Sequence, residues 1–181
     1  VVKPSTPADV KGLLRTAVRS DDPVLFFEHT RGYEIKGQVP VQEYTIPFGV
    51  ADVVREGTDV TVVAISIMRH KAMKAAEELA GEGVECEVID PRTIYPFDYD
   101  TVLTSLRKTG RLVVGHEANR RSNIGGEIVS QVVERGFDLL QAQPRIVAGL
   151  DVPMPYNRAL EALVIPDEAR ITETILAAVG R

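Results

Sequence analysis

The stretch DVTVVAIS, Asp59 to Ser66, decides how this chain folds. It is a nearly continuous apolar run rich in β-branched residues, which is typical of a strand buried on both faces of a parallel sheet. A helical pattern follows over Met68 to Gly81, and a second short apolar run follows over Val84 to Ile89. A strand, a helix and another strand in this order predict one turn of a wound α/β sheet.

The same alternation continues toward the C-terminus and extends the prediction to a complete domain. We expect the following further elements: a short strand over Val50–Arg55, a helix from Asp98 to about Lys108, a strand over Arg111–His116, a helix over Ile124–Glu134, a strand over Arg145–Gly149, a helical region from Leu160 and a final helix over Asp167–Val179. The pattern predicts an α/β fold with a doubly wound, mostly parallel sheet.

The residues before this domain follow a different pattern. Thr6 and Pro7 begin a helix, because threonine is a good cap and proline fits the first helical position. The run VLFFEH, Val24 to His29, predicts a buried strand. Glycines and prolines then break any regular pattern. We therefore divide the chain into residues 1–30, a linker over 31–49 and a domain over 50–181. Because the chain opens on valine in mid-pattern, we expect it to be part of a longer protein.

Composition narrows the class of protein. The formal net charge of −5, with charges of both signs interspersed, argues against a nucleic-acid-binding protein. No apolar run approaches the roughly 20 residues of a membrane span. The single cysteine, Cys86, excludes an internal disulfide and is typical of a cytoplasmic protein. It lies in the alternating run VECEVID, so we expect a small buried core residue rather than a catalytic thiol.

The sequence contains no self-contained catalytic motif. A Walker loop, GxGxxG and HExxH are all missing, and the three histidines are too far apart in sequence to indicate a metal site. Two polar loops nevertheless follow predicted strands: DPRTIYPFD, Asp90 to Asp98, and HEANRRSN, His116 to Asn123. In wound α/β sheets, function is found at the carboxyl ends of strands. We therefore look for a site in these two loops.

Several readings stay open for the HEANRRSN loop. His116 and Glu117 either belong to a binding surface or acid–base pair, or are structural, with Glu117 paired to Arg120 or Arg121. The two arginines either face an anionic partner or are simply solvated. The adjacent glycines Gly125-Gly126 predict a close approach of a helix to the sheet.

The DPRTIYPFD loop is interpreted as a structural element. Asp90 and Arg92 are expected to form a charge pair that shapes the loop. Tyr95 and Phe97, on either side of Pro96, are expected to be packed apolar residues.

The order of four motifs adds a family resemblance. DPRTIYPFD, then HEA at 116–118, GGEI at 125–128 and DVPMPY at 151–156 resemble the C-terminal half of the beta subunit of thiamine-dependent 2-oxo acid dehydrogenases. The resemblance covers nearly the whole chain. It implies that residues 1–30 are the last helix and strand of a thiamine-pyrimidine-binding domain, and that residues 50–181 are a transketolase C-terminal-like domain.

The resemblance implies a role within a larger enzyme. In that family, alpha and beta subunits form a heterotetramer that holds thiamine diphosphate and magnesium. It decarboxylates a 2-oxo acid such as pyruvate or a branched-chain 2-oxo acid, and transfers the acyl unit to lipoyl on a dihydrolipoyl acyltransferase core. The family's catalytic glutamate and histidine correspond to positions before Val1. We therefore expect no catalytic or cofactor-binding residue here, and a chain that is inactive alone.

The resemblance also implies two sets of site residues. The family's potassium site corresponds to Ala17, Ser20 and Asp22, although aspartate and asparagine are usual at the last two positions. Docking of the acyltransferase core corresponds to a second set: His116, Glu117, Arg120, Arg121, Gln141 and Asp151, with Gln141 at a position that is commonly acidic.

Two alternatives remain. The stretch VVAISIMRHKAMKAAEEL, Val62 to Leu79, is similar to the acetoin-cleaving relatives, whereas DVPMPY is closer to the pyruvate enzymes. The second alternative is a non-catalytic assembly and docking module. The sequence does not choose between these alternatives and the 2-oxo acid dehydrogenase.

Overall fold

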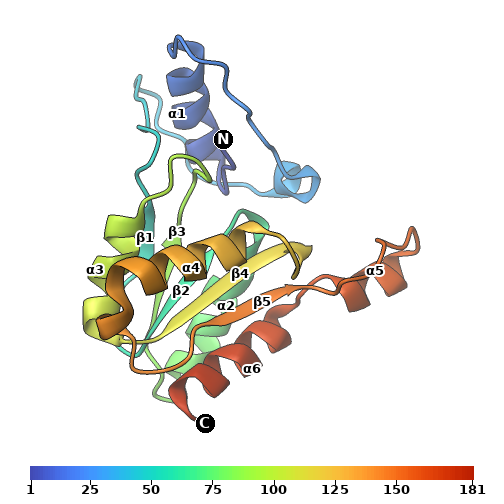
Figure 1. Cartoon of the computed structure of the whole chain (residues 1–181). Helices are drawn as coiled ribbons and strands as arrows, with labels where there is room; N and C mark the ends of the chain where they lie inside the picture. Colours follow the sequence, from blue (N-terminus) through green and yellow to red (C-terminus); the bar gives the residue numbers. More distant parts are fainter.

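The computed structural model describes residues 1–181 and contains one five-stranded sheet with helices on both faces (Figure 1). The elements in chain order are α1 (Pro7–Val18), the 3-10 helix η1 (Thr30–Glu34), β1 (Asp52–Arg55), β2 (Val60–Ala64), α2 (Ile67–Ala80), β3 (Cys86–Asp90), α3 (Tyr99–Thr109), β4 (Leu112–Asn119), α4 (Ile124–Gly136), the 3-10 helix η2 (Phe137–Leu139), β5 (Arg145–Gly149), α5 (Arg158–Val164) and α6 (Glu168–Val179). The helices and strands predicted after residue 50 are all present, with ends that differ by a few residues.

The strand order is β1-β3-β2-β4-β5. Strands β3, β2, β4 and β5 run parallel, and β1 pairs antiparallel with β3 at one edge. The chain passes from β2 to β3 on one side and then returns to place β4 on the other side of β2. The winding direction therefore reverses between β2 and β4. This confirms the predicted doubly wound, mostly parallel α/β sheet.

The core consists of two apolar layers, one on each face of the sheet. Helices α2 and α6 cover one face, and helices α3 and α4 cover the other (Figure 1). Successive residues of β2 serve the two layers in turn: Val62 packs with α2 and α6, and Val63 packs with α3 and α4. Both side chains are at most 1% exposed. This explains the unbroken apolar run in the sequence, because both faces of the strand are covered.

A buried carboxylate interrupts the apolar core on β3. The Glu87 side chain is 2% exposed, and it accepts hydrogen bonds from the Lys108 ammonium on α3 and from the Gly57 N–H at 3.3 Å. Burial acts to raise the pKa of Glu87, but the hydrogen bonds, led by that of Lys108, outweigh burial and lower it. Next to it, Cys86 is fully buried and unpaired, as expected from its place in an alternating run.

Strand β5 forms the other edge of the sheet, and two arginines donate hydrogen bonds to its backbone carbonyls. The Arg120 guanidinium donates to the Ile146 carbonyl at 2.7 Å, and the Arg170 guanidinium donates to the Ala148 carbonyl at 2.8 Å. Ile146 and Ala148 are two residues apart, so their carbonyls point the same way along the strand. These carbonyls are therefore satisfied without a further strand.

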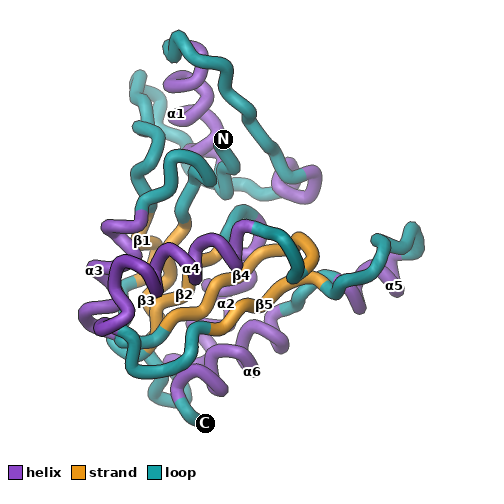
Figure 2. The backbone as a smooth tube through the Cα atoms, viewed as in Figure 1, coloured by secondary structure: helices purple, strands orange, loops and turns teal.

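Helix α1 begins as predicted. The Thr6 hydroxyl accepts from the Asp9 N–H at 3.1 Å, and the Asp9 carboxylate accepts from the Thr6 N–H at 3.1 Å, so the two residues form a capping box. The segment before β1 lies along this helix. Tyr44 donates to the Ala8 carbonyl at 2.7 Å and Thr16 donates to the Ile46 carbonyl at 2.7 Å. Most of the chain between α1 and β1 is loop (Figure 2).

The predicted buried strand Val24–His29 is wrong. The segment contains one isolated bridge, between Phe26 and Val2, in place of a ladder. Leu25 is 60% exposed and Phe27 is 52% exposed. A strand that is buried on both faces needs neighbours along both edges and above both faces, whereas here the backbone has only Val2 beside it. The segment is apolar, as its sequence shows, but no neighbouring strands or helices in this fold bury its side chains.

No helix combines the length and the apolarity that crossing a bilayer requires, and the longest helix, α2, has 14 residues.

Candidate functional site

The first 35 residues lie on the carboxyl edge of the sheet, where both predicted polar loops end (Figure 1). The Lys3 N–H donates to the Arg92 carbonyl at 2.9 Å, just after β3. The Ser66 hydroxyl, just after β2, donates to the Pro4 carbonyl at 3.4 Å, and the His70 ring contacts the Ser5 carbonyl at 2.7 Å. The strand ends therefore face a layer of chain that covers them, and cavities form between the two.

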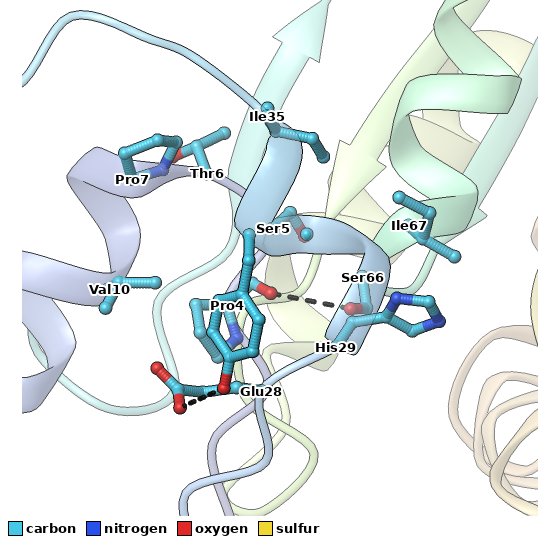
Figure 3. Close-up of a pocket in the computed structure, with 12 residues that line it drawn as sticks. Pro4, Ser5, Thr6, Pro7, Val10, Glu28, His29, Ile35, Ser66 and Ile67 are labelled. Carbon is cyan, nitrogen blue, oxygen red and sulfur yellow. Dashed lines mark hydrogen bonds between the residues drawn. The ribbon is translucent and has the colours of Figure 1, made fainter.

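The larger cavity at this junction has a volume of about 330 Å³ (Figure 3). Its walls include Val10 of α1, Ile67 of α2, and Glu28 and Tyr33, which hydrogen bond to each other at 2.9 Å. Ser66 lies at its base, on the turn from β2 to α2, with a φ of 58°. A positive φ is uncommon for serine and marks this turn as strained.

No base activates Ser66 in this arrangement. His29 also lines the cavity, but both of its ring nitrogens are occupied. Nδ1 accepts from the Arg31 N–H at 3.1 Å, and Nε2 contacts the Glu117 carboxylate at 2.7 Å. Nucleophilic catalysis needs a base with a free nitrogen within hydrogen-bond reach of the hydroxyl. The cavity therefore has the character of a binding site or an interface rather than that of a hydrolase centre.

Asp90 is the most perturbed carboxyl at the carboxyl edge. Its side chain is 1% exposed; the Arg92 N–H donates to it at 3.0 Å, and the Arg69 guanidinium lies 3.8 Å away. Burial, helped by the nearby Asp9 charge, raises the pKa of Asp90 to about 7, although the Ser5 hydroxyl and the two arginines act to lower it.

The expected charge pair between Asp90 and Arg92 is wrong, because the Arg92 guanidinium has other partners. The Arg92 guanidinium turns away from Asp90, contacts Asp9 at 3.7 Å and donates to the Val50 carbonyl at 2.9 Å. The positive φ of Arg92, 57°, allows its backbone N–H rather than its charge to serve Asp90. Tyr95 is also unlike the expectation, since it is 75% exposed rather than packed.

His116 lies at the end of β4 and is buried, with an exposed fraction of 3%. Neither ring nitrogen makes a hydrogen bond within ordinary geometry. Burial is the largest influence on the pKa of His116 and lowers it. The Ala118 backbone and the Asn123 side chain act to raise the pKa, and the charges of Lys3 and Arg120 act to lower it. The ring presses against the first turn of α4, where a Cβ at Gly125 would come within 2.6 Å of Nε2. The predicted close approach of helix to sheet is therefore confirmed for Gly125, whereas Gly126 has free space around it.

The residues predicted to dock a partner do not form one surface. Arg121 is exposed and pairs with Asp151, whose carboxylate accepts from the Arg121 backbone at 3.1 Å and lies 3.3 Å from its guanidinium. Arg120 is tied to β5, and Glu117 pairs with His29 rather than with either arginine.

Gln141 lies apart from the other predicted docking residues, at the amino-terminal edge of the sheet. Its N–H donates to the Gly110 carbonyl at 2.7 Å, and its side chain covers that glycine. The structure therefore places Gln141 at the opposite end of the strands from the Arg121–Asp151 pair.

The residues predicted to hold potassium lie at the exposed end of α1. The Ala17 carbonyl accepts from the Ser20 N–H at 3.2 Å, and the Ser20 hydroxyl accepts from the Asp22 N–H at 3.2 Å. The Ala17 carbonyl oxygen and the Ser20 hydroxyl oxygen are thus engaged within the turn, and the potassium site stays a prediction. No group of three or more His, Cys, Asp or Glu side chains is arranged to hold a metal ion.

Three residues at the junction were not predicted from the sequence: His29 and Ser66 line the larger cavity, and Lys3 lines a second cavity. Of these residues, only Ser66 could have been selected from the sequence, because it lies at the carboxyl end of the apolar strand that decides the fold. His29 was assigned to a buried strand, so its contact with Glu117 was hidden.

A five-stranded sheet wound in both directions, with its carboxyl edge covered by an N-terminal layer, defines the class of open, doubly wound α/β domains. The chain belongs to the transketolase C-terminal domain family, whose pattern matches residues 49–171. This confirms the fold that the motif order implied.

The curated relatives are beta subunits. The chain is 48% identical over 171 residues to the acetoin:2,6-dichlorophenolindophenol oxidoreductase subunit beta of Cupriavidus necator, covering 94% of this chain and 51% of the relative. It is 42% identical to the pyruvate dehydrogenase E1 component subunit beta of Bacillus subtilis, covering 96% of this chain and 54% of the relative. It is also 42% identical to the 2-oxoisovalerate dehydrogenase subunit beta of the same organism, with 98% and 55% covered. The chain spans about half the length of these relatives.

The solved structures agree on the fold. A split gene transketolase, described as an inactive beta4 tetramer, superposes with a TM-score of 0.80 at 25% identity, covering 98% of this chain and 57% of that one. A transketolase from Pichia stipitis superposes with a TM-score of 0.64 at 13% identity, covering 98% of this chain and 25% of that one.

Proposed function

We propose that this chain is the C-terminal part of the beta subunit of a thiamine-dependent 2-oxo acid dehydrogenase, and that it contributes subunit assembly rather than catalysis. The observation that carries the proposal is the extent of the match to beta subunits, which covers at least 94% of this chain at 42–48% identity. The parent enzyme decarboxylates a 2-oxo acid and transfers the acyl unit to lipoyl. Residues 1–30 then belong to the pyrimidine-binding domain, 31–49 to the linker and 50–181 to the C-terminal domain.

The exposed apolar residues support an assembly role. Val18 at the end of α1 is 78% exposed, and Leu25 and Phe27 in the segment that follows are 60% and 52% exposed. A second group lies on the projecting arm that carries α5, where Leu163 is 69% exposed (Figure 1). Clusters of exposed apolar residues are typical of surfaces that bind another protein. We assign them to contacts with an alpha subunit, a second beta subunit or the rest of the beta subunit.

The chemistry of the parent enzyme is supplied by groups outside this chain. Thiamine diphosphate and magnesium, where bound, would provide decarboxylation, and the residues described here offer no cluster for the metal. The exposed Arg121–Asp151 pair is our candidate contact for the acyltransferase core, and the turn at Ala17, Ser20 and Asp22 is the candidate for potassium. Neither assignment depends on the other.

The acetoin enzymes are a second candidate for the parent. One observation favours them: the 48% identity to the Cupriavidus necator subunit exceeds the 42% identity to each of the two Bacillus subtilis dehydrogenase subunits. Within Bacillus subtilis the acetoin subunit, at 43% identity, is nearly level with the pyruvate subunit at 42%. Under this reading the parent cleaves acetoin rather than a 2-oxo acid, and this chain keeps the same place in the subunit.

A hybrid subunit tests the proposal. The matching C-terminal part of the Cupriavidus necator acetoin subunit, or of the Bacillus subtilis pyruvate subunit, is replaced by this chain and purified with the cognate alpha subunit. Reduction of 2,6-dichlorophenolindophenol is then followed with acetoin, pyruvate or 2-oxoisovalerate. We expect at least one assembled hybrid to be active and this chain alone to be inactive, with negligible binding of thiamine diphosphate in calorimetry. Hybrids that assemble but reduce no dye, or tight cofactor binding by this chain alone, would overturn the proposal.

A further inference from the structure

Strand β5 and helix α6 lie side by side at one edge of the sheet (Figure 1), and both line a cavity of about 430 Å³. The helix contributes Arg170, Glu173, Thr174 and Ala177, whose spacing places them on one face. The first residue of the lining along the chain is Arg120, so the N-terminal layer takes no part in this cavity. Its volume lies in the range of small-molecule sites, about 300 to 1,000 Å³.

The outer edge of β5 offers donors to this cavity, because its acceptors are already used. The Ile146 and Ala148 carbonyls accept from Arg120 and Arg170 at 2.7 and 2.8 Å. In an extended strand, the N–H of a residue points to the same side as its carbonyl. A guanidinium has five N–H groups, so both arginines keep donors beyond those bonds. A ligand at this edge must therefore supply acceptors.

Arg145 brings a third guanidinium to the cavity, and this one is not tied to β5. Side chains alternate along a strand, so Arg145 lies on the same face of the sheet as Val147, which packs with α2 and α6. The Arg145 Nε is buried without a hydrogen-bond partner. An unpaired buried polar group is costly and uncommon in folded proteins. An acceptor in the cavity would supply the missing hydrogen bond.

The charges around the cavity leave an excess of positive charge. Two carboxylates, Asp151 and Glu173, line it beside the three arginines. Asp151 is already paired with Arg121, which lies 3.3 Å away. Counting Arg121, four guanidiniums stand against two carboxylates, which leaves two positive charges. A phosphate monoester carries about −1.5 to −2 at neutral pH and matches this excess.

The shape of the donors also favours phosphate over carboxylate. The planar fork of arginine matches phosphate oxygens and binds them with two parallel hydrogen bonds. A phosphate monoester presents three acceptor oxygens, so more than one arginine can bind it at once, whereas a carboxylate presents two and carries a single charge. Gln143 adds a neutral polar group to the wall, which suits a hydroxylated body attached to the phosphate.

We propose that the cavity between β5 and α6 binds the phosphate group of a small, polar phosphate monoester. Arg145 donates its free N–H groups to the phosphate, and Arg120 and Arg170 add donors while they keep their bonds to β5. This binding site goes beyond the assembly role proposed above and is a property of the 181-residue chain by itself, so failure of the hybrid subunits would leave it unaffected.

The test is a calorimetric titration of the 181-residue chain with glycerol 3-phosphate, in a phosphate-free buffer at low salt. We expect one site with a dissociation constant of about 1 mM for a ligand of about ten non-hydrogen atoms. Inorganic phosphate should compete for the site, because it presents the same oxygens. Glycerate has a similar hydroxylated body with a carboxylate in place of the phosphate, and it should bind about tenfold more weakly.

Three single variants that each change the net charge by one separate the site from general attraction to charge. Arg145→Gln should weaken binding of glycerol 3-phosphate about tenfold. Glu173→Gln removes an exposed carboxylate from the wall and should tighten binding about threefold. Arg107→Gln, an exposed arginine on α3 outside the cavity, should leave the affinity unchanged. Thermal unfolding measures whether each variant is folded.

Four results would overturn the proposal. The first is no binding at about 20 mM glycerol 3-phosphate, a ceiling about twentyfold above the expected constant. The second is equal affinity for glycerate, and the third is binding that inorganic phosphate does not displace. The fourth is a folded Arg145→Gln that binds no more weakly than Arg107→Gln. If Arg145→Gln does not fold, Glu173→Gln decides, and an affinity that it leaves unchanged or weakens overturns the proposal.

Discussion

Replacing Asp90 with asparagine should remove a pH-dependent loss of stability. Burial raises the pKa of Asp90 to about 7 in the folded chain, whereas an aspartate in an unfolded chain has a pKa of about 3.9. The folded state therefore binds the proton more tightly than the unfolded state. This contribution to stability is complete below pH ~3.9 and is lost as the pH rises toward 7.

The magnitude follows from the separation of the two pKa values. Each unit of pKa difference corresponds to about 1.4 kcal/mol, so the wild-type chain should lose about 3 kcal/mol between pH 5 and pH 8 through this residue. Asparagine has nearly the shape of the protonated acid and does not titrate. The difference in unfolding free energy between Asp90→Asn and wild type should therefore move by about 3 kcal/mol in favour of the variant over this range.

Urea denaturation at half-unit steps of pH measures this difference directly. Other groups titrate in both proteins and cancel when the two curves are subtracted. A difference curve that is flat between pH 5 and pH 8 would refute the reasoning, because it would mean that Asp90 is ionised in the folded chain throughout. A curve that rises as the pH falls would reverse the sign and assign the dominant effect to Arg69 and Arg92.

Four further outcomes follow from the packing. Lys108→Met should destabilise the fold by about 3 kcal/mol in urea denaturation, because it leaves the buried Glu87 carboxylate without its cation; a change below about 1 kcal/mol would contradict the pair's importance. Gly126→Ala should stabilise the chain by about 0.5 kcal/mol because a helical Cβ there meets nothing. Gly125→Ala should destabilise it by about 2 kcal/mol because the Cβ collides with a histidine ring, and equal melting temperatures for the two alanine variants would contradict this. The thiol of Cys86 has its pKa raised to about 11 by burial, so it should react with a disulfide reagent at pH 8 only after unfolding, and fast labelling of the native chain would show that β3 opens.

The sequence predicted the sheet well because its strands are buried on both faces. Val62 and Val63 illustrate this: each serves a different apolar layer, so the run that contains them has no polar interruption. The same reasoning misled us at Leu25 and Phe27, because an apolar run reports a tendency to be buried and not the presence of partners. Their exposure was visible only once the neighbours were placed.

The candidate sites were less accessible to sequence reasoning because they depend on contacts between distant segments. His29 and Glu117 are 88 positions apart and meet at 2.7 Å. Lys3 reaches the cavity near His116 because the N-terminal layer folds over the strand ends. The polar loops indicated the correct edge of the sheet, but the pairing of their side chains required the fold.

The two arginines on β5 affect how this domain behaves at high concentration. An open sheet edge recruits strands from other molecules and is a common starting point for aggregation. Arg120 and Arg170, which lie outside β5, donate hydrogen bonds to the Ile146 and Ala148 carbonyls. An incoming strand must therefore first displace two charged hydrogen bonds. Despite its exposed apolar residues, the chain should therefore self-associate through side-chain surfaces and not by growth of the sheet at this edge.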